Sequence, residues 1–360
     1  MPLITPGSMS QDIQQFISSN IRVAHDTWQK LGGIESYYRF GSITLSVRHI
    51  GNTLVSTVTP AIKHALVNDI PETINGTIYT LDSRILSMRK PPGIWPFSTE
   101  THQGHQRIHW DTETGLALNS DESRGIWQLF NLKTACGLYW VADEATLPSW
   151  EAGSPLRIFI HWCSWLTGEQ LIHAAGLQWG NTGILLTGSG GSGKSTTTAA
   201  AVTAGWKTIG DDFVLLANKD IPRASCIYDT IKLTQQSLDK VAGIADKAVN
   251  PGRDPDDKSR VHLGDTFRQQ LIREISVKAL FALQISNTQD TRILPSSKAQ
   301  IMTALAPTTM FMLKTGVRES FLNMTKLVNL LPCFIIRLGA NPEEVINKLA
   351  IFIEYSIDSL

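Results

Sequence analysis

A glycine-rich segment between an apolar strand and a helix constrains this chain more than any other feature. Residues 188–195 read Gly-Ser-Gly-Gly-Ser-Gly-Lys-Ser and match every fixed position of the pattern GxxxxGK[ST]. The apolar run Ile184–Leu186 precedes the segment, and the Thr- and Ala-rich stretch Ser195–Ala204 follows it. Glycines let such a loop turn its N–H groups inward, and the helix adds the positive end of its dipole. The segment therefore predicts a cradle for the phosphates of a nucleotide.

Two polar side chains of this loop have expected tasks. We expect Lys194 to place its ammonium group against the β- and γ-phosphates and the Ser195 hydroxyl to bind Mg²⁺. The other predicted nucleotide contacts come from the loop and the first helical turn: Gly188, Ser189, Gly190, Gly191, Ser192, Gly193 and Thr196. ATP and Mg²⁺ are thus the predicted cofactors. The plain alternatives are a flexible Gly/Ser connection or a nucleotide-holding regulator without catalysis.

An acidic pair follows the predicted helix. Asp211 and Asp212 come after the short predicted strand Lys207–Gly210, and a strand end beside the phosphate loop is where a carboxylate can act on bound nucleotide. Neighbouring side chains on an extended backbone point in opposite directions. We therefore expect Asp211 to be the general base and Asp212 to bind the metal or its waters. A turn or a helix cap is the alternative interpretation.

His173 and Arg260 are weaker candidates. His173 precedes the strand that pairs with the one entering the loop, so its ring could lie near the phosphates or orient Asp211 by a hydrogen bond. An ordinary core histidine is the alternative. Arg253, Lys258 and Arg260 could close over the nucleotide, of which we favour Arg260, but a solvent-facing charged loop would have the same composition.

The second half of the chain has a pattern typical of a nucleotide-binding α/β domain. Strands at His173–Trp179 and Ile184–Thr187 flank a turn-like Gly180–Gly183, and Phe213–Leu216 is a further strand. Ile275–Gln284 and Cys333–Leu338 have the apolar character of buried strands. Asn341 and Pro342 are typical of a helix start, which predicts a closing helix to Ile357.

The length of 360 residues favours two domains. We predict an accessory domain over residues 1–150, of smaller mixed α+β type, and a phosphate-loop domain over 155–360. Gln11–Leu31 is expected to form a helix and Tyr37–Val47 a strand, while Pro91–Pro96 interrupts regular structure. Trp110–Trp150 is expected to form strands joined by turns.

Composition excludes several classes of function. Lys and Arg total 32, as do Asp and Glu, so no basic excess predicts nucleic-acid binding. No segment is long and apolar enough to predict a membrane span, and no secretory leader pattern is present. Four widely spaced cysteines favour a reducing compartment over a disulfide framework or zinc site. The expected localisation is cytoplasmic, and a homo-oligomer is compatible with the sequence, which leaves the oligomeric state open.

Residues 173–216 resemble the catalytic domain of HPr kinase/phosphorylase and its relatives. The resemblance lies in His173-Ala174-Ala175, in residues 183–196, in Gly205-Trp206 and in residues 209–214. It implies a fold related to phosphoenolpyruvate carboxykinase, with ATP on Gly188–Ser195, a catalytic base and a Mg²⁺ contact from Asp211 and Asp212, and His173 before the hairpin. The first 150 or so residues show no such resemblance.

One departure from this family shifts the expected substrate. The Glu-Val-Arg-Gly-Leu-Gly-like signature of the bifunctional enzyme is absent after Asp212. The chain is therefore more similar to the related kinases of lasso-peptide and other modified-peptide pathways. That resemblance implies transfer to a Ser or Thr hydroxyl of a small peptide, a protein or a free amino acid, with the accessory domain as acceptor holder by analogy.

Three other functions stay open from the sequence. A nucleotide-gated ATPase or binding module would turn over ATP without an acceptor. A carboxykinase-like enzyme would act on a small metabolite, although no clear basic cluster for a carboxylate substrate is present. A scaffolding protein with an inherited loop would not bind ATP.

Overall fold

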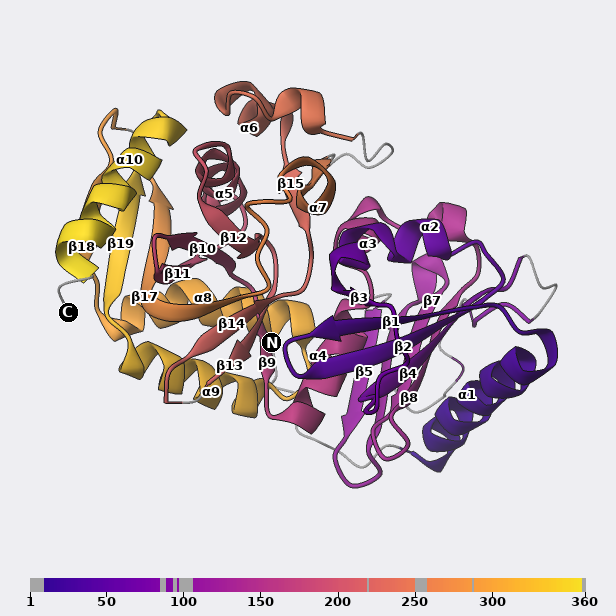
Figure 1. The fold of residues 1–360 in the computed structure, drawn as a ribbon. Helices are drawn as coiled ribbons and strands as arrows, with labels where there is room; N and C mark the ends of the chain where they lie inside the picture. The colour runs from indigo at the N-terminus through magenta and orange to yellow at the C-terminus, as the bar shows by residue number, and fades with distance from the viewer. Residues whose placement is uncertain are drawn as a thin grey trace. The chain divides into compact units, whose positions relative to one another are not determined.

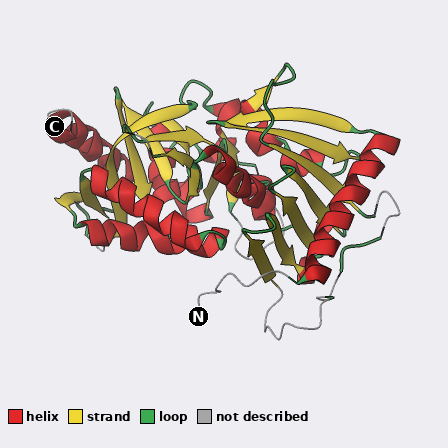
Figure 2. Cartoon of the chain, turned by 90° about the horizontal axis from the view of Figure 1, so that it is seen from below, coloured by secondary structure: helices red, strands yellow, loops and turns green. Residues whose placement is uncertain are grey.

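The chain forms two compact units that each combine helices with a β-sheet (Figures 1 and 2). The computed structural model describes residues 10–84, 89–92, 96, 106–218, 220–249, 258–286 and 288–357. Unit 1 contains Met1–Pro60, Ala65–Thr167 and Lys314–Gly316, and unit 2 contains Ala61–His64, Gly168–Leu313 and Val317–Leu360. Both units are of mixed α/β type. The predicted boundary places the start of the second domain at Pro155, whereas in the structure the helix over Arg157–Thr167 belongs to unit 1.

Unit 1 is built on an eight-stranded sheet in the order β3-β1-β2-β4-β8-β7-β6-β5. Strands β2, β4 and β8 run parallel, and the other neighbours are antiparallel. Its helices and strands are α1 (Gln11–Leu31), β1 (Ile34–Phe40), β2 (Ile43–Ile50), α2 (Val55–Val58), β3 (Leu66–Val67), β4 (Gly76–Asp82), β5 (Gln106–Asp111), β6 (Leu116–Asp121), β7 (Ile126–Asn131), β8 (Cys136–Val141), α3 (Ser149–Gly153) and α4 (Arg157–Thr167).

Two helices cover the opposite faces of this sheet. Helix α1, capped by Ser10, buries Ile13, Ile17 and Ile21 against one face, where Trp127 also points. Burying one isoleucine side chain stabilises a fold by about 1.5–3 kcal/mol. Phe130, on the other face of β7, contacts helix α4 through aromatic side chains. Because side chains alternate between the two faces along a strand, β7 contributes to a packing layer on each face of the sheet.

The N-terminal helix was predicted with its observed bounds, but the strand after it was not. The sequence placed one strand over Tyr37–Val47, whereas the chain turns at Gly41 and forms the antiparallel pair β1–β2. Phe40 pairs with Ile43, so the loop holds only two residues, and Gly41 takes φ +51°. A continuous aromatic and β-branched pattern hides such a tight turn, because both strands of the hairpin favour the same residue types. Pro91 and Pro92 lie outside helices and strands, while residues 93–95 are not described.

Unit 2 is built on a nine-stranded sheet. Its main path is β12-β10-β11-β17-β14-β13-β9, with β19 beside β17 and β18 beside β19. Strands β11, β17 and β19 are parallel. The elements are β9 (Gln170–Ile172), β10 (Ala175–Trp179), β11 (Thr182–Thr187), α5 (Lys194–Thr203), β12 (Lys207–Gly210), β13 (Val214–Ala217), β14 (Arg223–Cys226), β15 (Thr230–Leu233), α6 (Gln235–Lys240), β16 (Ser259–His262), α7 (Leu263–Thr266), β17 (Glu274–Ile285), β18 (Arg292–Pro295), α8 (Lys298–Leu313), α9 (Val317–Leu330), β19 (Cys333–Leu338) and α10 (Pro342–Phe352).

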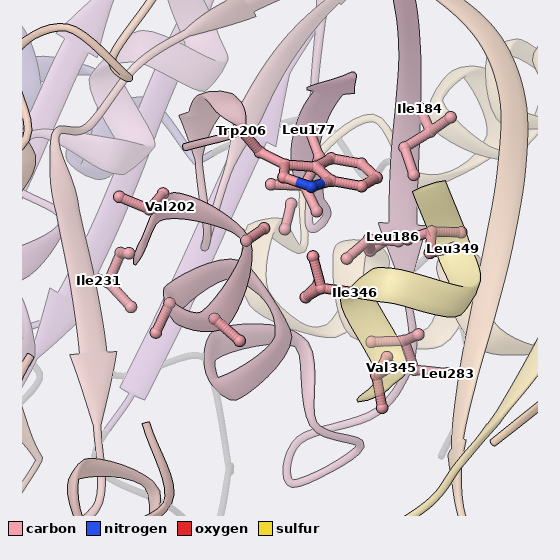
Figure 3. Close-up of a cluster of buried hydrophobic side chains, with 14 of the residues drawn as sticks. Leu177, Ile184, Leu186, Val202, Trp206, Ile231, Leu283, Val345, Ile346 and Leu349 are labelled. Carbon is pink, nitrogen blue, oxygen red and sulfur yellow. The ribbon is translucent and has the colours of Figure 1, made fainter. Parts of the chain in front are cut away.

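Helices pack on both faces of the unit 2 sheet. Helices α5 and α10 lie on one face, where Leu186 and Val202 share a core with Ile346 and Leu349 (Figure 3). Helices α8 and α9 contribute to the core on the other face. The helix that follows the glycine-rich loop is therefore anchored along its apolar side. This anchoring holds the N-terminal end of α5 in a defined position.

Most predicted elements of unit 2 are confirmed, with shifted ends in the hairpin. Strands β12 and β19 have the predicted bounds, and Asn341 caps α10 by accepting a hydrogen bond from the Glu343 N–H at 2.9 Å. The hairpin β10–β11 has a two-residue loop at Gly180–Asn181, so Gly183 lies within β11. A Cβ atom on Gly183 would lie 2.4 Å from the Ser276 carbonyl oxygen on β17. Glycine at position 183 therefore permits β11 to lie close to β17 and is not part of the hairpin turn.

A buried histidine in unit 1 makes stability depend on pH. His49 is 1% exposed, and its Nδ1 lies 2.7 Å from the Thr80 hydroxyl. Burial lowers the pKa of His49 to about 4, because it disfavours the charged ring. The unfolded chain takes up this proton near its ordinary pKa of 6.5. Stability is therefore full above that value and falls as pH drops toward 4.

We expect acidification from pH 7 to pH 5 to cost about 1–2 kcal/mol of unfolding free energy through His49. His49→Asn keeps a polar side chain at this place and cannot titrate, so its loss over the same range should be smaller. Chemical denaturation of unit 1 at both pH values measures this difference. His25→Asn is the control, because that side chain is half exposed. Equal losses for His49→Asn and the wild type would contradict the assignment.

Candidate phosphate site

The glycine-rich loop joins the end of β11 to the start of α5. Gly193 is the N-cap of α5 with φ +100°, and a Cβ atom there would lie 2.5 Å from Leu338 Cδ1. Gly188 has φ +155°, and its Cβ would lie 2.4 Å from the Ser192 hydroxyl oxygen. Side chains at these positions would strain the backbone and collide with neighbours. The local fold thus requires the glycines that the phosphate-loop pattern contains.

Lys194 is folded back over this loop. Its Nζ donates to the Gly188 carbonyl oxygen at 2.7 Å and lies 3.4 Å from that of Ser189. The side chain is buried, and burial lowers the pKa of Lys194, while the charges of Asp211 and Asp212 oppose this shift. The ammonium group is therefore held where the loop, the start of α5 and the acidic pair meet.

Asp211 follows β12 and faces the start of α5. The residue is 3% exposed and accepts a hydrogen bond from the Ser195 hydroxyl. Its Oδ1 has no hydrogen-bond partner within the described part of the chain. Burial raises the pKa of Asp211, and the neighbouring Asp212 adds to this shift. Asp211 thus has a buried oxygen available for a ligand and greater proton affinity than an exposed aspartate.

Asp212 contacts both His173 and Lys232. His173 Nε2 lies 3.3 Å from its Oδ1, and Lys232 Nζ lies 2.7 Å from its Oδ2. Burial alone would raise the pKa of Asp212, but Lys232 and His173 together hold it well below the ordinary value. The two adjacent carboxylates therefore differ: Asp212 is a fixed anion, whereas Asp211 is the more basic of the pair.

The structure brings His173 into this cluster with a different partner from the one expected. From the sequence, the His173 ring could orient Asp211 by a hydrogen bond, but in the structure the ring contacts Asp212. Its backbone N–H donates to the Thr309 hydroxyl at 3.0 Å, which fixes the residue between β9 and β10. Burial lowers the pKa of His173, so the ring is neutral at neutral pH. Its position on Asp212 follows from the fold, since β9 and β10 lie on different parts of the sheet path.

Lys232 was missed by sequence reasoning. It lies on β15, and only 17% of its side chain is exposed. A single lysine in a short strand is usually a solvent-facing residue, so no sequence signal distinguished it. The flanking residues Ile231 and Leu233 are apolar, which is typical of a strand with one face on the core, but this pattern does not single out Lys232.

The remaining predicted contacts are distributed around the cluster. Arg260 is on β16, directly opposite Lys232 in the antiparallel pair β15–β16. The Thr196 hydroxyl lies 2.9 Å from that of Ser237 on α6. Lys258 lies close enough for its charge to lower the pKa of Lys194. Arg253 falls outside the described residues.

The oxygen atoms of this site fit a magnesium ion that is shared with phosphates. Among the described residues, no group of three or more His, Cys, Asp or Glu side chains is placed to hold a metal by itself. The site does contain the Ser195 hydroxyl and the ionised carboxylate of Asp212. Mg²⁺ commonly binds through few protein oxygens together with nucleotide phosphates and water. The donor set is of that kind.

Similarity to known proteins is found among solved structures. No protein-family model matches the chain, and no curated protein matches it. Among solved structures, it is similar to the Hpr(Ser) kinase/phosphatase from Coxiella burnetii. The likeness has a TM-score of 0.30 and 12% identity, and covers 51% of this chain and 95% of that one. No helix in the described residues has the length and apolar character needed to span a bilayer.

Proposed function

We propose that this chain is an ATP-dependent phosphotransferase that moves the γ-phosphoryl group to a hydroxyl. The observation that carries this proposal is the meeting of two unlike carboxylates, Asp211 and Asp212, with Lys194 and Ser195 at the start of α5. A loop that only joins a strand to a helix has no need for this buried set of charges. Burying charged groups is costly unless they are paired or serve a ligand.

The charges of the cluster suit a polyanion. Lys194 is buried and Lys232 is partly buried beside the acidic pair, and the charge of Lys258 acts on Lys194. Backbone N–H groups at the start of α5 add the positive end of the helix dipole. Together these groups offset the charge of a triphosphate and of the phosphoryl group during transfer.

Each acidic residue has a separate task in the proposed reaction. Asp211 is the general base: its buried Oδ1 accepts the proton of the acceptor hydroxyl as that oxygen attacks the γ-phosphorus. Asp212, which contacts His173 and Lys232 in the structure, stays ionised and orients the metal or its waters. Ser195 and Asp212 are the residues proposed to hold Mg²⁺, which when bound neutralises charge on the phosphate oxygens. Lys194 binds the β- and γ-phosphates.

We propose a peptide, protein or amino-acid hydroxyl as the acceptor. The support is the resemblance of the sequence over residues 173–216 to HPr-kinase-like enzymes, together with the missing signature of the bifunctional branch. Serine on a short peptide, as in lasso-peptide kinases, is the proposed substrate class. Unit 1 is the proposed acceptor holder.

Turnover measurements separate this function from the alternatives. We expect ATP with Mg²⁺ to raise the melting temperature of unit 2 by several degrees, since about 100-fold excess over Kd adds about 2.7 kcal/mol of stability. ATP with a metal chelator is the control. We then expect release of ADP from [γ-³²P]ATP to depend on an added acceptor, tested with serine and with short peptides ending in serine, and label to appear on the hydroxyl.

Two outcomes would contradict the proposal. Equal release of ADP with and without every acceptor would instead assign a nucleotide-gated ATPase. No change in melting temperature with Mg²⁺ and ATP would exclude nucleotide binding and leave a structural role.

A further inference from the structure

Lys232 is a partly buried cation to which the proposed reaction assigns no direct contact with the nucleotide. Its Nζ makes a 2.7 Å ion pair with Asp212 Oδ2, and its side chain is 17% exposed. Asp212 already has a second partner in His173, at 3.3 Å from the other oxygen. The carboxylate would therefore stay anchored if the lysine moved to a new anion.

The strand pair β15–β16 presents this lysine next to an arginine. Lys232 and Arg260 are directly paired across the two antiparallel strands, so their side chains leave the same face of the ribbon. Lys194, at the start of α5, is near enough to the acidic pair for the charges of Asp211 and Asp212 to act on it. The charges of Lys194 and Lys232 both act on Asp211 and on His173. Two cations from different elements thus converge on one small volume.

We propose that Lys232 is a second phosphate-binding cation, which Asp212 holds until a triphosphate enters and which then contacts the γ-phosphate. This inference rests on the proposed function. Lysine has a flexible stem and a compact ammonium group, so a shift of its head from carboxylate to phosphate requires no movement of β15. The exchange keeps the ammonium paired throughout. It also places positive charge between the incoming phosphate and the fixed Asp212 anion.

Nucleotide affinities test this contact without an acceptor. We expect Lys232→Met to bind the non-hydrolysable ATP analogue AMPPNP with Mg²⁺ about tenfold or more weakly than the wild type, since charged hydrogen bonds are among the strong ones. Affinity for ADP with Mg²⁺ should stay within about twofold, because ADP lacks the γ-phosphate. Lys232→Arg should keep most of the affinity for AMPPNP. Calorimetric titration measures all three, and Lys240→Met, on the exposed end of α6, is the matched control.

A double variant separates direct contact from simple charge compensation. Because Asp212 is also a proposed metal contact, Asp212→Asn alone is the baseline for this comparison. If Lys232 only neutralises Asp212, adding Lys232→Met to Asp212→Asn should weaken AMPPNP binding no further, whereas a direct contact predicts a further loss. Unchanged affinity of Lys232→Met for both nucleotides, or equal affinity of Asp212→Asn and the double variant for AMPPNP, would overturn the inference. Failure of the wild type to bind either nucleotide would instead refute the proposed function, and normal ADP binding shows that each variant is folded.

Discussion

Asp211→Asn is expected to lower phosphoryl transfer by about two to four orders of magnitude, which is the usual contribution of a general base. ATP affinity should stay within about threefold, because the asparagine oxygen can still accept the Ser195 hydrogen bond. The physical reason is that Asp211 combines a buried, unpartnered Oδ1 with a raised pKa. An amide has the same shape but cannot take a proton. Single-turnover transfer and calorimetric titration with AMPPNP measure the two quantities separately.

Asp239→Asn is a matched control for this change. Asp239 is an exposed residue of α6 that accepts a hydrogen bond from Gln235, so the same substitution there should leave transfer unchanged. Equal transfer rates for Asp211→Asn and the wild type would remove Asp211 as the base. A parallel loss of nucleotide binding would assign it to binding instead.

Lys194→Ala is expected to weaken binding of ATP by about 100-fold or more and so to abolish transfer at ordinary ATP concentrations. This lysine is the buried cation of the loop, and its Nζ is held at the Gly188 carbonyl, next to the N-terminal end of α5. A charged hydrogen bond to phosphate in such a site contributes about 1.5–3 kcal/mol, and loss of the net charge adds to this. Calorimetric titration with AMPPNP and Mg²⁺ measures the change.

Stability must be measured beside affinity for this variant, because Lys194 also bonds the loop backbone. Lys194→Met keeps the apolar stem, so it should remain folded and show the same loss of binding. Lys240→Ala on the surface of α6 should bind as the wild type does. Affinity of Lys194→Met within about threefold of wild type would show that the loop does not hold phosphates through this residue.

Local signals predicted the elements that depend on few neighbouring residues. Helix α1 and the start of α10 were predicted from caps and apolar spacing, and both begin where expected. The glycine-rich loop follows a strand and opens a helix, as its pattern requires. In contrast, the helix pair α8–α9 was not predicted. Pro307 lies inside α8, and proline in a helix interior obscures the usual helical signal.

The candidate site shows the same division between local and distant information. The sequence alone determined the phosphate-loop pattern and the adjacency of Asp211 and Asp212, because these are properties of consecutive residues. Only the tertiary structure decided that His173 and Lys232 meet on Asp212 and that Asp211 keeps an unpartnered oxygen. Those contacts join β9, β12 and β15, which are distant along the chain, and sheet pairing and burial determine which carboxylate is neutralised. The physical difference between two identical neighbouring side chains thus arises from their surroundings.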